Sequence, residues 1–165
     1  MKQLWAPWRI AYIQQPEPQR GCLFCTVARE REDDRNHVVY RGERCFVMLN
    51  LYPYNSGHLM VAPYQHTGFF QDLDSEVGAE MFRTAQVAVR ALTESMHPDG
   101  LNLGINQGKV AGAGIADHIH MHVVPRWNGD TNFMPVLAEV KVIPELLSAT
   151  ASKLRPLFQS LSRDR

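Results

Sequence analysis

The sequence predicts an α+β domain, in which an antiparallel sheet of about five strands packs with one long helix and a C-terminal helix. Short apolar runs joined by hairpin-like turns occur in both halves of the chain. A single long helical pattern lies between them, which favours this class over alternating βαβ units. The 165 residues and the apolar fraction of 45% indicate one domain spanning 1–165 with an ordinary core.

The first half supplies three of the expected strands. Residues 1–21 form an N-terminal arm that ends in loop-forming residues, and the mixed charges of 29–35 indicate a solvated connection. Apolar β-type runs at 37–40 and 45–49 suit a hairpin. A third strand over 58–62 follows a turn-like segment containing proline, asparagine and glycine.

The second half contains both helices. Apolar positions keep a helical spacing from Asp74 or Ser75 to about Met96, with Ser75 as the expected cap. A strand over 101–105 then leads through a glycine-rich loop to a strand over 118–124. Residues 140–165 form a helical tail. Its helix is expected over 144–161, and Pro156 is expected to break or kink it.

Three histidines in the 118–124 strand are the most informative feature of the chain. His118, His120 and His122 alternate with apolar residues, so all three project from one face while the apolar residues face a core. An imidazole can be a metal ligand, a nucleophile or a proton carrier. The alternatives are a polar outer strand face, or a His-x-His pair that chelates one zinc.

Composition excludes several classes of function. Seventeen basic and seventeen acidic residues cancel, so no overall field attracts a nucleic acid or an anionic membrane. The start of the chain lacks the pattern of a secretory signal, and no apolar run approaches the length of a membrane span. Three cysteines are an odd number for a disulfide framework. Reduced thiols in a cytoplasm are therefore expected.

Cys22 and Cys25 have the spacing with which two thiolates grip one metal ion. A structural zinc needs four ligands, and we expect His66 and His118 to supply the other two. A redox pair is an alternative, disfavoured because no βαβ pattern surrounds the motif. Two buried cysteines without a ligand are the other alternative. With His118 bound to zinc, His120 remains available for chemistry.

Residues 106–114 form a glycine-rich loop directly before the histidine strand. Glycines let backbone N–H groups approach an anion closely, although such a loop can also be merely flexible. The loop is not a Walker P-loop, because it is one residue short and Val110 replaces the required Ser or Thr. Beside His120, it indicates phosphoryl-group chemistry.

The chain resembles the histidine triad (HIT) superfamily of nucleotide hydrolases and transferases. Residues 118–124 match its His-φ-His-φ-His-φ-φ signature, where φ is apolar, and the resemblance extends over most of the chain. The segments 4–9 and 125–133 are most similar to the bacterial branch of diadenosine tetraphosphate hydrolases and phosphorylases. The resemblance implies a HIT-like sheet and a homodimer paired through the long helix and a strand.

The resemblance also assigns roles to residues. It implies that His120 is the nucleophile, that His122 contacts the phosphate, and that zinc is held by both cysteines and two histidines. Asn50 is expected at the ribose hydroxyls and Leu49 against the base. The remaining phosphate contacts are expected from Asn106 and from the backbone amides near Gly112 and Gly114. Lys109 and Arg126 are candidates to neutralise a longer polyphosphate, and a structural role is expected for His58.

The predicted function is hydrolysis at the α-phosphate of a dinucleoside polyphosphate through a nucleotidyl-His120 intermediate. His122 favours water as acceptor, because phosphorylase and transferase branches often carry Gln at that position. The Gln or Ser that many members place shortly before the first histidine is missing here. The alternatives are a phosphorylase that uses inorganic phosphate and an AMP-binding module with negligible turnover.

Overall fold

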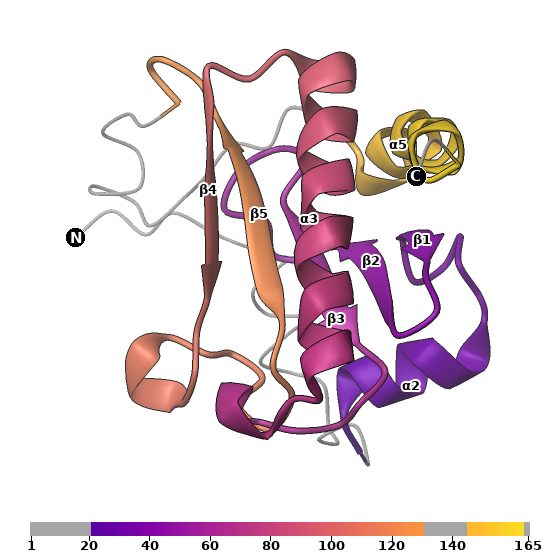
Figure 1. Ribbon diagram of the computed structural model, residues 1–165. Helices are drawn as coiled ribbons and strands as arrows, with labels where there is room; N and C mark the ends of the chain where they lie inside the picture. The colour runs from indigo at the N-terminus through magenta and orange to yellow at the C-terminus, as the bar shows by residue number, and fades with distance from the viewer. Residues whose placement is uncertain (1–20, 131–144, 164–165) are drawn as a thin grey trace.

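The computed structural model describes residues 21–130 and 145–163, and it confirms the predicted α+β class. Five strands form one sheet in the order β1-β2-β3-β5-β4, and every pair is antiparallel. The strands are β1 (Val38–Arg41), β2 (Cys45–Leu49), β3 (Leu59–Pro63), β4 (Gly100–Ile105) and β5 (Met121–Arg126) (Figure 1). Most of the expected N-terminal arm lies outside the described residues.

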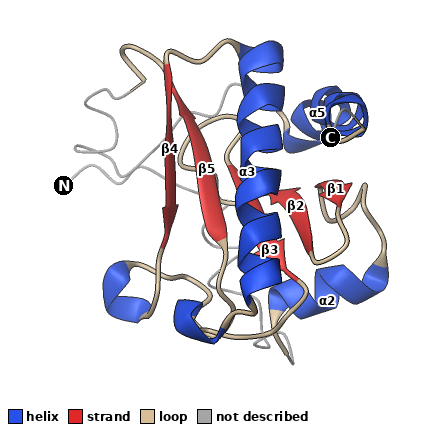
Figure 2. Cartoon of the chain, viewed as in Figure 1, coloured by secondary structure: helices blue, strands red, loops and turns tan. Residues whose placement is uncertain are grey.

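Helices cover both faces of the sheet (Figure 2). The helical elements are α2 (Leu23–Glu30), η1 (Phe70–Asp72), α3 (Ser75–Met96), η2 (Lys109–Ala111) and α5 (Leu147–Leu161). On one face, α3 and α5 enclose a core that includes Val61, Met121 and Val123. On the other face, Phe24 and Val27 of α2 pack on alternate strand residues, which include Met48 and Met60. The segment 112–120 follows η2 on the α2 side and leads into β5.

The long helix α3 has the predicted extent but a different cap. Asp74, not Ser75, is the N-cap, and its side chain accepts a hydrogen bond from the Glu76 N–H. Its carboxylate also lies where the helix dipole favours negative charge. The helix ends at His97, whose φ of 47° is left-handed.

Helix α2 was not predicted. Its last residues, Arg29 and Glu30, belong to the charged run for which the sequence predicts a solvated connection. The helix is only 8 residues long, and only Phe24 and Val27 are fully buried. Leu23 and Ala28 also pack against this core, so the apolar positions do follow a helical spacing. Over only two turns this spacing is too short to identify a helix, and tertiary packing stabilises α2. Cys22 is its N-cap residue and Cys25 lies in its first turn.

Pro156 was expected to break or kink helix α5, and the structure shows no break, because the helix continues through it. Pro156 is exposed, so water can satisfy the carbonyl that loses its N–H partner. Buried Leu154 and Phe158 hold the helix against the core on either side of the proline. The start of the predicted tail, residues 140–144, lies outside the described residues.

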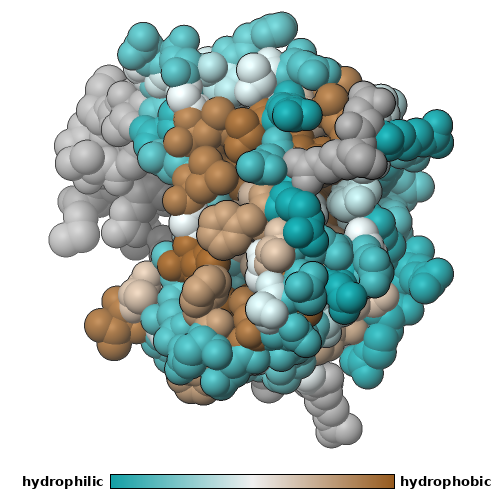
Figure 3. Space-filling model, viewed as in Figure 1, coloured by the Kyte–Doolittle hydropathy of each residue, from teal (hydrophilic) through white to brown (hydrophobic). Residues whose placement is uncertain are grey.

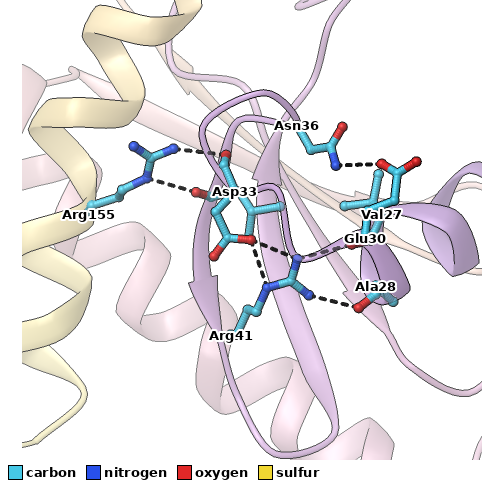
Figure 4. A network of polar contacts seen from close by, with 8 residues as sticks. Val27, Ala28, Glu30, Asp33, Asn36, Arg41 and Arg155 are labelled. Carbon is cyan, nitrogen blue, oxygen red and sulfur yellow. Dashed lines mark hydrogen bonds and ion pairs between the residues drawn. The ribbon is translucent and has the colours of Figure 1, made fainter.

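Arg155 of α5 ties this helix to the edge strand β1 and to the segment before it, and Figure 4 shows its bonds to that segment. Its Nε donates to the Val38 carbonyl and its Nη2 to the Asp33 carbonyl, both at 2.9 Å, and it pairs with Asp34. In the same network, Arg41 binds the Asp33 carboxylate at 2.8 Å. The helix therefore covers one edge of the sheet.

The histidine strand begins three residues later than predicted. Extending the β3–β5 register would place Ile119 opposite Pro63, which has no N–H to donate. Instead, the Pro63 carbonyl lies 2.9 Å from His118 Nε2, and the Ile119 N–H donates to the Thr67 carbonyl. The sheet pairing therefore stops at Met121. No helix among the described residues is long and apolar enough to span a membrane.

Candidate active site and metal centre

The structure brings the three histidines together on the α2 side of the sheet. The ring centroids of His120 and His122 are 4.8 Å apart, and the rings of both His118 and His120 contact Phe24. The intervening Met121 belongs to the opposite core. The predicted shared face is therefore present, although only His122 lies within the strand itself.

Hydrogen bonding fixes the His120 tautomer. Its Nδ1 lies 2.9 Å from the His118 carbonyl oxygen, which can only accept, so Nδ1 carries the proton. Burial lowers the pKa of His120, although the hydrogen bond to the carbonyl opposes this shift. The ring is thus neutral near pH 7 with its lone pair on Nε2. This is the protonation state that a nucleophilic imidazole needs.

His58 is part of the site, although the sequence indicated only a structural role. Its Nδ1 accepts the Tyr54 N–H at 3.0 Å, so the proton of the neutral ring is on Nε2. That Nε2 lies 2.9 Å from His122 Nδ1 and donates to it. His122 in turn must carry its proton on Nε2. In the sequence, the one signal that His58 belongs to the site was its position after a glycine and directly before β3.

Both of these buried rings stay neutral well into the acid range. Burial lowers the pKa of His58 to about 3, and the nearby His122 adds to the effect. Burial likewise lowers the pKa of His122 to about 4, with a smaller contribution from His120. Charging either ring would place an ion in a poorly solvated space. His122 can therefore act as a hydrogen-bond donor through Nε2 without being a cation.

An apolar pocket of about 370 Å³ opens beside His120 and His122. Several of the predicted substrate residues line it, namely Asn50, Gly112 and Gly114. Its apolar walls come from α2, β2, β3 and the loop before β5: Leu23, Met48, Met60 and Ile115. This combination of an apolar wall and a few polar groups suits a nucleoside next to a phosphate.

The prediction that Leu49 contacts the base is wrong. Leu49 is fully buried in the core that faces α3. Met48 lines the pocket instead, because neighbouring strand residues point to opposite faces. Asn106 also lies outside this pocket. It lines an adjoining cavity that shares His122 and Tyr54 with the first.

Four side chains converge at the N-terminus of α2 as the sequence analysis expected. One ligand atom from each of Cys22, Cys25, His66 and His118 lies within 4.8 Å of all the others. The Nδ1 atoms of His66 and His118 are 3.3 Å apart, and Cys22 Sγ lies 3.1 Å from His118 Nδ1. Tetrahedral zinc with Zn–N bonds of about 2.1 Å would separate two nitrogens by roughly 3.4 Å. The donor set therefore fits a metal ion.

The outer contacts of the cluster also suit a metal centre. The Pro63 carbonyl fixes the proton of His118 on Nε2, which leaves the Nδ1 lone pair for the metal. Burial raises the pKa of Cys22, and the adjacent Cys25 thiol adds to this. A cation would reverse the shift, because a coordinated thiol loses its proton.

These observations define a class: a small α+β protein with a neutral histidine beside an apolar pocket of about 370 Å³ and a Cys2His2 cluster next to it. The chain belongs to the histidine triad family, since the HIT domain model of that family matches residues 31–129. An AP-4-A phosphorylase of Mycobacterium tuberculosis is 39% identical over 157 residues, covering 91% of this chain and 80% of that protein.

Two further relatives support this placement. A bis(5'-adenosyl)-triphosphatase of Dictyostelium discoideum is 28% identical over 131 residues, covering 76% of this chain and 87% of its own length. A crystal structure of a Zn-bound histidine triad protein from Mycobacterium smegmatis has a TM-score of 0.70 at 33% identity. That match covers 88% of this chain and 98% of the other. The predicted family and fold are confirmed.

Proposed function

We propose that this protein cleaves dinucleoside polyphosphates at the α-phosphorus through a nucleotidyl-His120 intermediate. The observation that carries the proposal is the fixed tautomer of His120, whose Nδ1 is bound to the His118 carbonyl at 2.9 Å. The Nε2 lone pair is thereby available at a pocket of nucleotide size. The phosphorylase and triphosphatase relatives support a substrate of this class.

The reaction has two displacements. His120 Nε2 forms a bond to the α-phosphorus while the bond from phosphorus to the bridging oxygen breaks, and that oxygen leaves with the electron pair. His122 Nε2–H donates to the phosphate as charge develops. An acceptor oxygen then attacks the phosphorus, the P–N bond breaks, and its electrons return to Nε2. The proton of the acceptor passes to solvent.

The acceptor is water or inorganic phosphate. With water as the acceptor the protein is a hydrolase, which is the activity that His122 in the third triad position favours. The 39% identity to a phosphorylase favours phosphate as the second candidate. The phosphate oxygens would be held by Asn106, His122 and the backbone amides near Gly112 and Gly114. Asn50 would bind the ribose hydroxyls.

Product analysis tests the proposal. Incubation with diadenosine tetraphosphate should give AMP and ATP when water is the acceptor, or ADP and ATP when phosphate is required. Because the P–N bond of a nucleotidyl-histidine is labile in acid, quenching in alkaline denaturant should trap a nucleotide on the wild-type protein. The His120→Ala variant should fold but show neither trapping nor turnover. Nucleotide binding without any turnover would instead identify an AMP-binding module.

Zinc is the metal that the Cys2His2 cluster fits best. The Zn-bound relative supports this assignment. The metal would be structural, because Cys22, Cys25, His66 and His118 would fill all four positions. Metal analysis of the purified protein should give about one equivalent per chain. Reduced cysteines suit a reducing compartment, so we place the protein in the cytoplasm, which cell fractionation can check.

The open edge of the sheet supports a homodimer. Among the described residues, β4 pairs only with β5, and Leu103 on β4 and Phe82 on α3 are each about half exposed. Figure 3 shows hydrophobic residues gathered over β4 and the adjoining side of α3. A second copy can pair with this antiparallel edge around a two-fold axis. Light scattering should give twice the chain mass, and Leu103→Lys should give the monomer.

A further inference from the structure

A second cavity adjoins the nucleotide pocket on the same face of the sheet. It has a volume of about 290 Å³ and shares Tyr54 and His122 with that pocket. Its walls are more polar, with Asn55, Asn102 and Asn106 among its lining residues, together with Arg126. The two pockets therefore meet at the triad and differ in chemistry.

Arg126 is held rigidly in this second cavity. Its Nε and Nη2 bind the two carboxylate oxygens of Asp130 at 2.6 and 2.8 Å, and Nη1 donates to the Asn102 side chain at 3.0 Å. Buried Asn55 donates to the same carboxylate and to the Pro125 carbonyl. The bidentate ion pair fixes the guanidinium plane and largely compensates its charge.

A compensated ion pair surrounded by amides suits a neutral polar ligand better than a multiply charged anion. Carboxamides and a fixed guanidinium can hydrogen-bond to sugar hydroxyls and to ring nitrogens. Tyr54, Leu103 and Val124 add apolar surface to the same cavity. A nucleoside combines these two kinds of surface, whereas a free phosphate does not.

The order of residues along β5 places this cavity on the leaving-group side. His120 lies directly before β5. Along the strand from there, the chain passes His122 and then reaches Arg126, which lies four residues, or roughly 13 Å, beyond His122. Displacement by His120 expels the leaving group away from the nucleophile, towards this end. A chain of several phosphates is needed to reach so far.

We propose that this cavity binds the distal nucleoside of a dinucleoside polyphosphate, and so selects such substrates over nucleotides that end in a phosphate. This inference rests on the proposed function and assigns the second half of the substrate. Arg126, positioned by Asp130, and Asn102 are the specificity-determining residues. The reacting phosphorus stays between the two pockets.

The test compares diadenosine tetraphosphate with adenosine 5'-tetraphosphate, which has the same phosphate chain but lacks the second nucleoside. The wild-type kcat/KM should be higher for the dinucleotide by about 10-fold. Asn102→Ala should bring this ratio close to one, while kcat/KM for adenosine tetraphosphate stays nearly constant. Arg126→Gln should lower the ratio as well. Arg90→Gln, which removes an exposed α3 cation, should keep the wild-type ratio.

Two results would overturn the inference while leaving the proposed function intact. One is a wild-type ratio close to one. The other is an equal loss for both substrates in Asn102→Ala, which would mean that the cavity binds the half that both substrates share. Absence of turnover with either substrate, in the presence and absence of phosphate, would contradict the proposed function itself. Asn102→Ala leaves the ion pair of Arg126 with Asp130 in place, so this variant still tests the inference if Arg126→Gln fails to fold.

Discussion

The carbonyl oxygen of His118 accepts the Nδ1 proton of His120 at 2.9 Å, while the imidazole of His118 belongs to the Cys2His2 cluster. One residue thus contributes its side chain to the candidate metal centre and its backbone carbonyl to the His120 ring. The position of His118 is also fixed by the Pro63 carbonyl. Metal binding at the cluster and the orientation of the His120 ring are therefore coupled through His118.

Removing a metal ligand should weaken both the fold and the activity. Cys22→Ser and His66→Ala should each lose the bound zinc, lower the Tm and reduce kcat by about 10–100-fold. Metal analysis, thermal unfolding and steady-state kinetics check this. Cys45→Ala is the matched control, because Cys45 is buried elsewhere against Thr84 and should keep the metal. Full metal content in Cys22→Ser would contradict the assigned ligand set.

His58 should act as a positioning residue for His122. In His58→Phe the ring that donates to His122 Nδ1 is lost, so His122 can adopt the wrong tautomer. The expected result is a kcat lower by about 10–100-fold with little change in KM. Nitrogen NMR should show the His122 proton redistributed between Nδ1 and Nε2. His58→Gln, whose amide can still donate, should recover part of the activity, and equal losses in both variants would argue against this role.

Stability should fall in mild acid because the buried histidines bind protons more readily in the unfolded chain. The pKa of His122 is about 4 and that of His58 about 3 in the folded protein, against an ordinary value near 6.5. The two neutral rings therefore cost no stability above about pH 6.5. The loss of stability grows as the pH falls below 6.5 and is complete once the pH has passed through 4 and 3. Chemical unfolding from pH 7 to pH 4 measures this. His58→Phe should show a shallower slope, and an unchanged slope would contradict these protonation states.

Gly68 should be intolerant of any side chain. A Cβ at this position would lie 2.5 Å from the Ala116 carbonyl oxygen, in the segment that connects the pocket glycines to His118. Gly68→Ala should destabilise the fold by about 1–3 kcal/mol and raise the KM for the nucleotide. Thermal unfolding and kinetics report the two effects. Gly78→Ala in α3 meets no atom within 4 Å and should instead stabilise the fold by about 0.5–1 kcal/mol.

The sequence predicted the sheet, the long helix and the Cys22–Cys25 pair because each has a strong local pattern. The histidine ligands lie 41 and 93 residues from Cys25, and the family resemblance supported their assignment. The details it missed depend on contacts between distant residues. All five residues of β2 are buried, so no alternation of polar and apolar residues could distinguish Met48, at the pocket, from Leu49, in the core. The late start of β5 depends on Pro63, and the role of His58 depends on His122, 64 residues away.

The two edges of the sheet differ, and this limits growth of an assembly. At β1, the Arg155 side chain already binds the Val38 carbonyl, and α5 packs against the strand. Among the described residues, β4 alone offers a strand that another chain can extend. A molecule with one open sheet edge can pair with a single partner, and the resulting dimer has no open edge for a third copy. In the proposed homodimer, pairing of the two β4 edges would therefore protect the sheet against fibre formation by stoichiometry rather than by surface charge.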